Sequence, residues 1–238
     1  MSSRNDAVNQ VINLAAKKRG AYVCVSNVHM CMETLDSVGF RSIVNDADLV
    51  IPDGRPIFFA QKILGAAGAS QVRGQDIMND ICKMSGRNKL NVGLYGGSSI
   101  EVLESTAEEL QGKFPDINIT YKYSPPFRAL SEKEDERVVE ELISQGVNVL
   151  FVGIGCPKQE QWMAEHKGRV NCVMLGVGAA FDFISGSKKR APVWMQKAGL
   201  EWFSRLLSEP RRLWKRYLKQ NPRFIFHFGR QIFFGKNY

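Results

Sequence analysis

Short apolar runs alternate with helix-prone stretches along most of the chain. Each run has four to seven residues, is rich in Val, Ile, Leu and aromatic side chains, and is bounded by turn residues. The runs cover residues 21–25, 48–51, 91–95, 117–121, 147–153 and 171–177, and a first helix is expected over 5–19. Strands that alternate with helices form a parallel sheet, because each crossover needs a connection of helix length. The pattern predicts an α/β protein with a Rossmann-like parallel sheet and flanking helices.

The composition changes near residue 186. The 238 residues carry a net charge of +8, yet residues 187–238 hold thirteen Lys or Arg against two acidic residues, a local net of +11. The same segment holds eleven of the 24 aromatic residues. We therefore expect a Rossmann-like domain over 1–186 and a basic, amphipathic helical appendage over 187–238, which favours an anionic and partly apolar surface such as a membrane or a nucleic acid.

A helix of this appendage is expected to begin at Pro210. On a helical wheel, basic side chains gather opposite an apolar face. The apolar face holds Leu213, Trp214, Tyr217 and Leu218, and the basic face holds Arg211, Arg212, Lys215, Arg216 and Lys219. Such a helix suits an anionic bilayer surface. The alternative is that the apolar face packs on the domain while the bases are solvated.

Several absences bear on location. The longest stretch without charged or strongly polar side chains is about eight residues, 174–181, which is too short to cross a bilayer. The N-terminal ten residues lack the apolar core of a secretory signal. The cysteines form no C-x-x-C pair and the three histidines are scattered, which favours reduced thiols over disulfides or zinc. We expect a cytoplasmic protein whose free cysteines are Cys24, Cys31, Cys82, Cys156 and Cys172.

Three glycine-rich turns follow predicted strands. They contain Gly96 and Gly97, then Gly155 with Pro157 and Lys158, and finally residues 176–183 with Asp182. Glycine lets a ligand approach the backbone, and a helix N-terminus offers free N–H groups, so these turns favour a phosphorylated ligand. The alternative is that they only turn strands into helices. None completes a dinucleotide-binding or P-loop motif, which argues against a nicotinamide-dependent oxidoreductase.

Two acidic patterns lie near the second predicted strand. Asp53 follows this strand, where a carboxylate can accept a proton from a substrate hydroxyl, although Pro-Asp-Gly is also an ordinary turn. Asp46 and Asp48 form a D-x-D pattern ahead of the strand. Metal-dependent nucleotide-sugar transferases use such a pattern to hold a divalent cation, so a transferase of this kind is one alternative.

A series of motifs resembles those of the WecG/TagA/CpsF glycosyltransferases. The motifs occur in the same order as in that family and cover nearly the whole chain. The P-K-Q-E block and the R-A-P, E-W and E-P-R-R series are the most specific parts of the resemblance. The motifs are S-N-V-H-M (26–30), P-D-G-R-P (52–56), V-R-G-Q-D (72–76), Y-G-G-S (95–98), Y-S-P-P-F (123–127), V-G-I-G-C-P-K-Q-E (152–160), G-V-G-A-A-F-D-F-I-S-G (176–186), R-A-P (190–192) and L-E-W-F-S-R-L-L-S-E-P-R-R (200–212).

The resemblance implies an inverting enzyme of cell-envelope polysaccharide assembly. It would move a sugar from a UDP-sugar to a polyprenyl-diphosphate-linked saccharide at the cytoplasmic membrane face, without a metal or another cofactor. By position, Asp53 matches the family's proposed general base, and Asn27 and Gln159 match pocket amides. The diphosphate would meet glycine-turn N–H groups, Lys158 and the appendage arginines Arg190 and Arg205. Asp182 would accept the uracil N3–H or cap a helix.

The chain departs from the family pattern at two places. Val25 stands where TagA-like members carry Thr, and Ser26 lies next to it. The family's pocket arginine falls on Gln71, while Arg73 lies two residues further and is a candidate replacement. The donor sugar therefore stays open, and N-acetylmannosamine is not assumed.

A nucleic-acid-binding protein is the alternative from another class. It would use the same basic, aromatic appendage, but it would leave Asp53, Gln159 and the glycine turns without a purpose, and no nucleic-acid-binding module is recognisable. We therefore expect no nucleic-acid partner. Homo-oligomers occur among family members, and this sequence leaves that possibility open.

Overall fold

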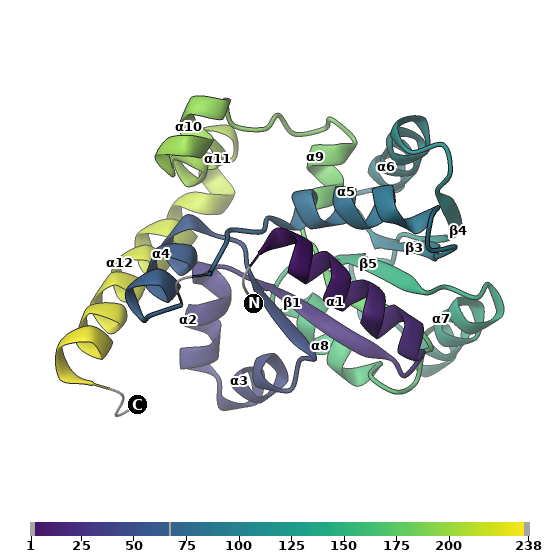
Figure 1. The fold of residues 1–238 in the computed structure, drawn as a ribbon, viewed down its shortest axis with the longest axis horizontal. Coiled ribbons are helices and arrows are strands. Elements are labelled where there is room, and N and C mark those ends of the chain that lie inside the picture. Colours follow the sequence, from purple (N-terminus) through teal and green to yellow (C-terminus); the bar gives the residue numbers. More distant parts are fainter. Residues whose placement is uncertain (1–2, 67, 236–238) are drawn as a thin grey trace.

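The computed structural model describes residues 3–66 and 68–235. Its centre is a six-stranded sheet in which neighbouring strands pair in parallel, in the order β2-β1-β6-β5-β3-β4 (Figure 1). The predicted α/β class and Rossmann-like parallel sheet are confirmed. The strands are β1 (Ala21–Ser26), β2 (Leu49–Pro52), β3 (Asn91–Gly96), β4 (Asn118–Tyr123), β5 (Val149–Gly153) and β6 (Val173–Gly176).

Helices cover both faces of the sheet. One face packs against α1 (Arg4–Lys17), α5 (Gly74–Ser85), α6 (Ile100–Lys113) and α9 (Ala180–Ile184). The other face packs against α2 (Val28–Asp36), α3 (Val38–Asn45), α7 (Glu132–Ser144) and α8 (Lys158–Glu165). Ser131 and Glu134 form a capping box at the start of α7. The remaining helix of the domain, α4 (Arg55–Ile63), follows β2.

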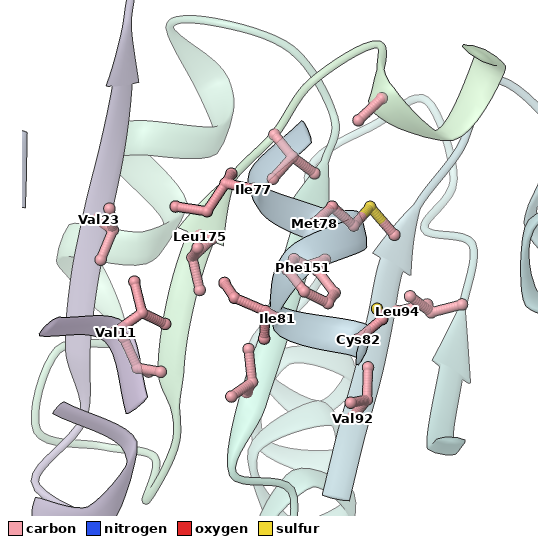
Figure 2. Packing of buried hydrophobic residues seen from close by; sticks show 14 of the residues in the cluster. Val11, Val23, Ile77, Met78, Ile81, Cys82, Val92, Leu94, Phe151 and Leu175 are labelled. Atoms are coloured by element: carbon pink, nitrogen blue, oxygen red, sulfur yellow. The ribbon is translucent and has the colours of Figure 1, made fainter. Parts of the chain in front are cut away.

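The core alternates along each strand, as a sheet that is buried on both faces requires. In β5, Phe151 points to the α1/α5 side, whereas Leu150 and Val152 belong to the opposite cluster. Figure 2 shows Ile77, Met78, Ile81 and Cys82 of α5 packed over the strands. Burying such side chains stabilises the fold by about 1.5–3 kcal/mol each. This two-sided core holds the carboxyl ends of the strands at one edge of the sheet.

Three helices follow the sheet: α10 (Val193–Ala198), α11 (Glu201–Ser208) and α12 (Pro210–Phe234). The long helix α12 lies along α2 at one side of the molecule (Figure 1). The apolar and basic faces that the helical wheel predicts for this helix match the observed exposure only in part. Leu213 is buried and Arg216 turns toward the domain, whereas Trp214 and Leu218 remain 46% and 67% exposed. In the part of the chain that the structure describes, no helix is both long and apolar enough to span a membrane.

Candidate active site

The carboxyl ends of β1 and β2 bring two predicted site residues together. Asp53 donates its backbone N–H to the carbonyl of Ser26 at 2.8 Å, which extends the pairing of the two strands by one residue. Asn27 caps α2 by accepting the N–H of Met30 at 3.3 Å. A Cβ built on Gly54 would lie 3.9 Å from the Cβ of Asn27, so the amide stands beside the turn that carries Asp53.

The surroundings of Asp53 favour its protonated form. Burial is the main cause, and with the nearby charges it raises the pKa of Asp53 to about 6. Arg205 and Arg73 act to lower this pKa, and Glu201 and Asp76 act to raise it. A carboxyl group that titrates near neutrality can work as a general base at cellular pH.

The backbone around Asp53 is supported by Gln71, the residue at which the resemblance implies a pocket arginine. Its Nε2 donates to the carbonyl of Asp53 at 2.8 Å. The next residue, Val72, donates its N–H to the carbonyl of Pro52 at 2.8 Å. Gln71 therefore supports the main chain of the turn, while its neighbour Arg73 supplies the positive charge.

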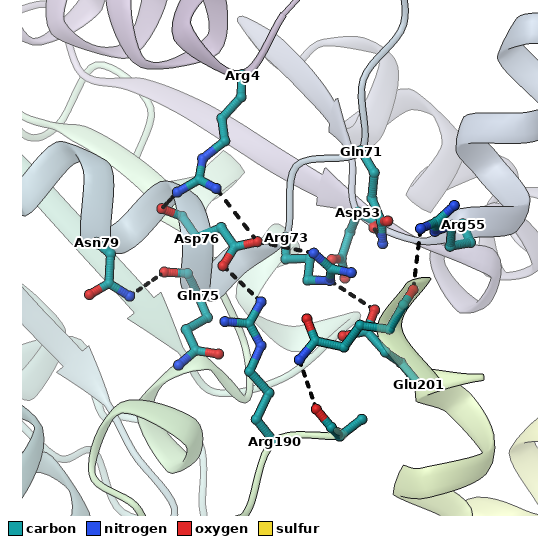
Figure 3. A network of polar contacts seen from close by, with 12 residues as sticks. Arg4, Asp53, Arg55, Gln71, Arg73, Gln75, Asp76, Asn79, Arg190 and Glu201 are labelled. Carbon is teal, nitrogen blue, oxygen red and sulfur yellow. Dashed lines mark hydrogen bonds and ion pairs between the residues drawn. The ribbon is translucent and has the colours of Figure 1, made fainter. Parts of the chain in front are cut away.

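Arg73 belongs to an ionic network that joins the domain to the appendage (Figure 3). Its Nε donates to Glu201 of α11 at 2.8 Å, and its NH1 donates to Asp76 at 3.2 Å. Asp76 also pairs with Arg190 at 2.9 Å, and its carbonyl accepts from Arg4. The guanidinium groups of Arg73 and Arg190 are thus each held by a carboxylate.

The turn between β5 and α8 is organised by Gln159. This side chain is 4% exposed; its Oε1 accepts the N–H of Gly155 at 3.2 Å, and its Nε2 donates to Glu160 at 2.7 Å. Pro157 is the N-cap residue of α8, and Lys158 next to it is exposed. Gln159 therefore holds the glycine turn in shape from beneath, on the same sheet edge as Asp53.

A pocket of about 810 Å³ opens beyond this turn, at the ends of β3 and β5. The helix after β3 covers one face of the sheet and the helix after β5 covers the other, so these neighbouring strands form a topological switch point, where α/β proteins bind ligands. The pocket is lined by Gly97, Gly155, Lys158, Asp182 and Arg212, among others.

Close backbone contact shapes the floor of this pocket. Gly96 has a φ of +128°, and a Cβ there would lie 2.6 Å from the carbonyl of Gly153, so only glycine fits. Asp182 is 6% exposed; its two oxygens accept from Ser98 at 2.7 Å and from Lys188 at 2.6 Å. Gly97 and Asp182 line this pocket, and Gly96 precedes Gly97 in the same turn.

Three appendage arginines lie between the pocket and Asp53. Arg212 lines the pocket, Arg205 faces Asp53, and Arg216 approaches Cys156 in the β5–α8 turn. Among the described residues, the Nε atoms of Arg205 and Arg216 are buried and have no hydrogen-bond partner. Burial lowers the pKa of Arg216, and the charges of Arg205 and Arg212 act in the same direction. Buried N–H groups without partners are costly, and three positive charges lie close together here, so the cluster favours an anionic ligand.

Two other side chains, those of Ser26 and His29, also lie near this edge of the sheet. Ser26 is 6% exposed and its Oγ lies 3.7 Å from the Sγ of Cys31. His29 stands on the first turn of α2, where burial and the charge of Arg216 lower its pKa to about 4. His29 is therefore neutral at physiological pH.

The D-x-D pattern lies at the opposite edge of the sheet. Asp48 accepts the N–H of Tyr22 at the start of β1 and pairs with Lys167 at 3.1 Å, while Asp46 accepts from Ser42. Both carboxylates thus stand at the amino ends of strands, whereas Asp53 stands at a carboxyl end. The structure gives no support to the alternative in which Asp46 and Asp48 hold a catalytic metal.

Some site residues carry no chemical signal of their own in the sequence. Glu160 and Glu201 look like ordinary acidic residues of helices, and Asp76 looks like a first-turn acid of α5. Arg216 is one of the five bases that the helical wheel places on the basic face of the appendage helix, which is expected to meet an anionic bilayer or, alternatively, solvent. Their inclusion in the V-R-G-Q-D, P-K-Q-E and L-E-W motifs, or in the basic appendage, is the signal that could have found them.

The fold and this site define an α/β protein whose carboxylate, arginine cluster and pocket share one sheet edge. A family model described as "Glycosyl transferase WecG/TagA/CpsF family" matches residues 1–238. The chain belongs to this family of glycosyltransferases of cell-envelope polysaccharide biosynthesis, which confirms the predicted resemblance.

Two curated relatives carry the same name, N-acetylglucosaminyldiphosphoundecaprenol N-acetyl-beta-D-mannosaminyltransferase. The protein of Bacillus spizizenii is 28% identical over 203 residues, which cover 85% of this chain and 76% of the relative. The protein of Staphylococcus aureus strain MW2 is 29% identical over 208 residues, which cover 86% of this chain and 78% of the relative.

Proposed function

We propose that this glycosyltransferase moves a sugar from a UDP-sugar to a polyprenyl-diphosphate-linked saccharide, with inversion and without a metal. The observation that carries the proposal is the row formed by the pocket, the arginine cluster and Asp53 along one sheet edge. Each of the three has the chemistry that one part of the reaction needs: a nucleoside site, a diphosphate site and a base.

The donor would lie across the ends of four strands. From β5, at the pocket, to β2, which carries Asp53, there are three strand spacings, or about 14 Å. A nucleoside diphosphate is long enough to span this gap. The uridine would occupy the pocket beside Asp182, the diphosphate would meet Arg205, Arg212 and Arg216, and the sugar would lie near Asn27.

Asp53 would take the proton from the acceptor hydroxyl as its oxygen attacks the anomeric carbon. The new bond forms on the side opposite the departing UDP, so the configuration inverts. The cap on α2 uses the amide oxygen of Asn27, so its Nδ2 group is the part that would bind a sugar hydroxyl. The guanidinium groups of Arg205 and Arg216, whose Nε atoms are buried and unpaired among the described residues, would stabilise the negative charge of the leaving diphosphate, as a metal does in other transferases.

The acceptor class rests on the relatives. Their name describes transfer to N-acetylglucosaminyl-diphospho-undecaprenol. A polyprenyl-diphosphate acceptor stays in the membrane, so the enzyme has to work at the bilayer surface. The chain departs from the family pattern at Val25 and Gln71, close to Asn27 and Asp53, so several UDP-sugars have to be compared to identify the donor.

The appendage suits peripheral binding to the cytoplasmic membrane face. Trp214, Leu218 and Ile225 are spaced by four and seven residues, so they share one face of α12, and they are 46%, 67% and 69% exposed. Lys215 and Lys219 border this face and are exposed. An exposed apolar stripe beside lysines is typical of a helix in the plane of an anionic membrane.

The test is UDP release from a panel of UDP-sugars, with a short-chain polyprenyl-diphosphate-saccharide acceptor and a chelator present. The proposal expects release from one donor that depends on the acceptor and survives chelation. Absence of release from every donor by folded protein with lipid present would contradict it. Tight duplex DNA binding with a steep salt dependence would then support the nucleic-acid alternative.

A further inference from the structure

The appendage is joined to the α/β domain by several ion pairs, and two of them offer a matched comparison. Near the site, Glu201 of α11 accepts from Arg73 at 2.8 Å. Far from it, Arg223 of α12 donates to Asp36 of α2 at 2.9 Å. Both pairs tie the same appendage to the same domain, but only the first includes residues whose charges act on Asp53.

The place of Arg73 makes the first pair more than a tether. Figure 3 shows its guanidinium beside Asp53, between Asp76 and Glu201. The two carboxylates hold it by Nε and NH1, so its charge is largely compensated. Asp76 itself is shared with Arg190 and lies near Arg4. Arg4 is held mainly by Asp80. Without Glu201, Asp76 would be the one carboxylate left to hold Arg73 while it also holds Arg190, and Arg73 would be drawn to the neighbouring carboxylate, Asp53.

We infer that Glu201 is a positioning residue that keeps Arg73 away from Asp53 and so leaves the base free to take the acceptor proton. The inference rests on the proposed role of Asp53 as base. Because Glu201 belongs to the appendage, the base becomes available only when α11 is docked on the domain. The appendage would thereby couple its own docking to the chemistry.

The charges around Asp53 predict the direction in which its pKa changes when Glu201 is replaced. The charged groups that act on Asp53 are Arg205 and Glu201 from α11, and Arg73 and Asp76 from the start of α5. Glu201 raises the pKa of Asp53, and Arg73 lowers it. Removing the charge of Glu201 therefore lowers the pKa of Asp53 directly, and also by leaving Arg73 less compensated. Both effects have the same direction.

The experiment compares the pH dependence of kcat/KM in the full-length variants Glu201→Gln and Asp36→Asn. Glu201→Gln is expected to move the acidic limb of the kcat/KM profile to lower pH, by about half a pH unit or more, and to lower kcat. Asp36→Asn, which loosens the appendage away from the site, is expected to leave the limb in place. Glu201→Asp keeps the charge and is expected to retain the parent's limb.

A double variant tests whether Glu201 acts through Arg73. If it does, Arg73→Gln combined with Glu201→Gln restores the limb toward its original pH, because one lowering and one raising charge are both lost. An unmoved limb in folded Glu201→Gln, or the same shift in Asp36→Asn, would overturn the inference and leave Glu201 as a tether. Full turnover in Asp53→Asn would instead overturn the proposed base, so the two failures are distinguishable.

Discussion

Gln159 donates its Nε2 hydrogen to Glu160, its neighbour in the chain, at 2.7 Å, and Glu160 has no exposed surface. The same Gln159 accepts the N–H of Gly155 at 3.2 Å, so both ends of its amide are held. Reversing the amide would place N–H against N–H at Gly155. Glu160 therefore determines which way Gln159 faces.

Two replacements of Glu160 test the effects of its charge and of its hydrogen bond separately. Burial raises the pKa of Glu160, so the stability of the fold is greatest when the group is protonated and falls as pH rises through that pKa. Glu160→Gln keeps an acceptor for Gln159 but cannot ionise. We expect it to melt above the parent protein at pH 8 and together with it below about pH 4. Glu160→Ala should cost about 1–3 kcal/mol at both pH values, because Gln159 loses its partner. Thermal melting across pH measures both effects.

The packing of Gln159 also explains one glycine in β6. A Cβ on Gly176 would lie 2.8 Å from Nε2 of Gln159 and 2.9 Å from Cε of Met163. Gly176→Ala should push Gln159 out of place, costing about 1–3 kcal/mol of stability together with activity. Gly112 in α6 is the control, since a Cβ there meets nothing within 4 Å and alanine should stabilise the helix by about 0.5–1 kcal/mol. Equal melting temperatures for the two variants would contradict this account.

Most of the fold could be predicted because it rests on local patterns. All six strands were expected within two residues of their ends, since a sheet buried on both faces leaves uninterrupted apolar runs. The order of the strands could not be read from the sequence. It depends on which faces the crossover helices cover, and several orders bury the same runs equally well.

The site, like the fold, could be predicted from the sequence only in part. Asp53 and Asn27 follow predicted strands, and the carboxyl ends of parallel strands meet at one edge, so their closeness is foreseeable. The pairing of Arg73 with Glu201 is not, because it joins residues 128 positions apart through an appendage whose docking no periodicity encodes. The helical wheel likewise places Arg216 on a face that points away from the domain, toward a bilayer or solvent, since it treats α12 as an isolated helix.

The base role of Asp53 predicts a pH profile. With a pKa of about 6, Asp53 is ionised and active above that pH, so kcat/KM should fall below pH 6. Asp53→Asn should lower kcat by about 10²- to 10⁴-fold while UDP affinity is retained. Because ionised Asp53 is disfavoured by burial, Asp53→Asn should also melt above the parent at pH 8 and not at pH 3. Unchanged turnover would remove Asp53 from the mechanism.

The arginine cluster predicts opposite effects on stability and binding. Arg216 lies near Arg205 and Arg212, and its Nε is buried and has no hydrogen-bond partner among the described residues. Arg216→Gln should therefore melt higher than the parent without ligand and bind UDP at least about tenfold more weakly, a loss of about 1.4 kcal/mol. Lys219→Gln, on the exposed side of the same helix, should change neither property. Calorimetric titration with UDP and melting curves measure the two.

The exposed face of α12 predicts membrane binding that depends on both its apolar and its basic residues. Trp214→Glu combined with Leu218→Glu should weaken binding to vesicles with anionic lipid by about tenfold or more, because each apolar side chain contributes about 1.5–3 kcal/mol on full burial. Raising the salt concentration should also weaken vesicle binding by the parent protein, because salt screens the attraction between the bordering lysines and the anionic lipid. Val38→Glu tests for a general effect of added acid, because Val38 is 75% exposed on α3. Vesicle flotation measures all three, and equal flotation of the α12 variant and the parent would assign membrane contact to another surface.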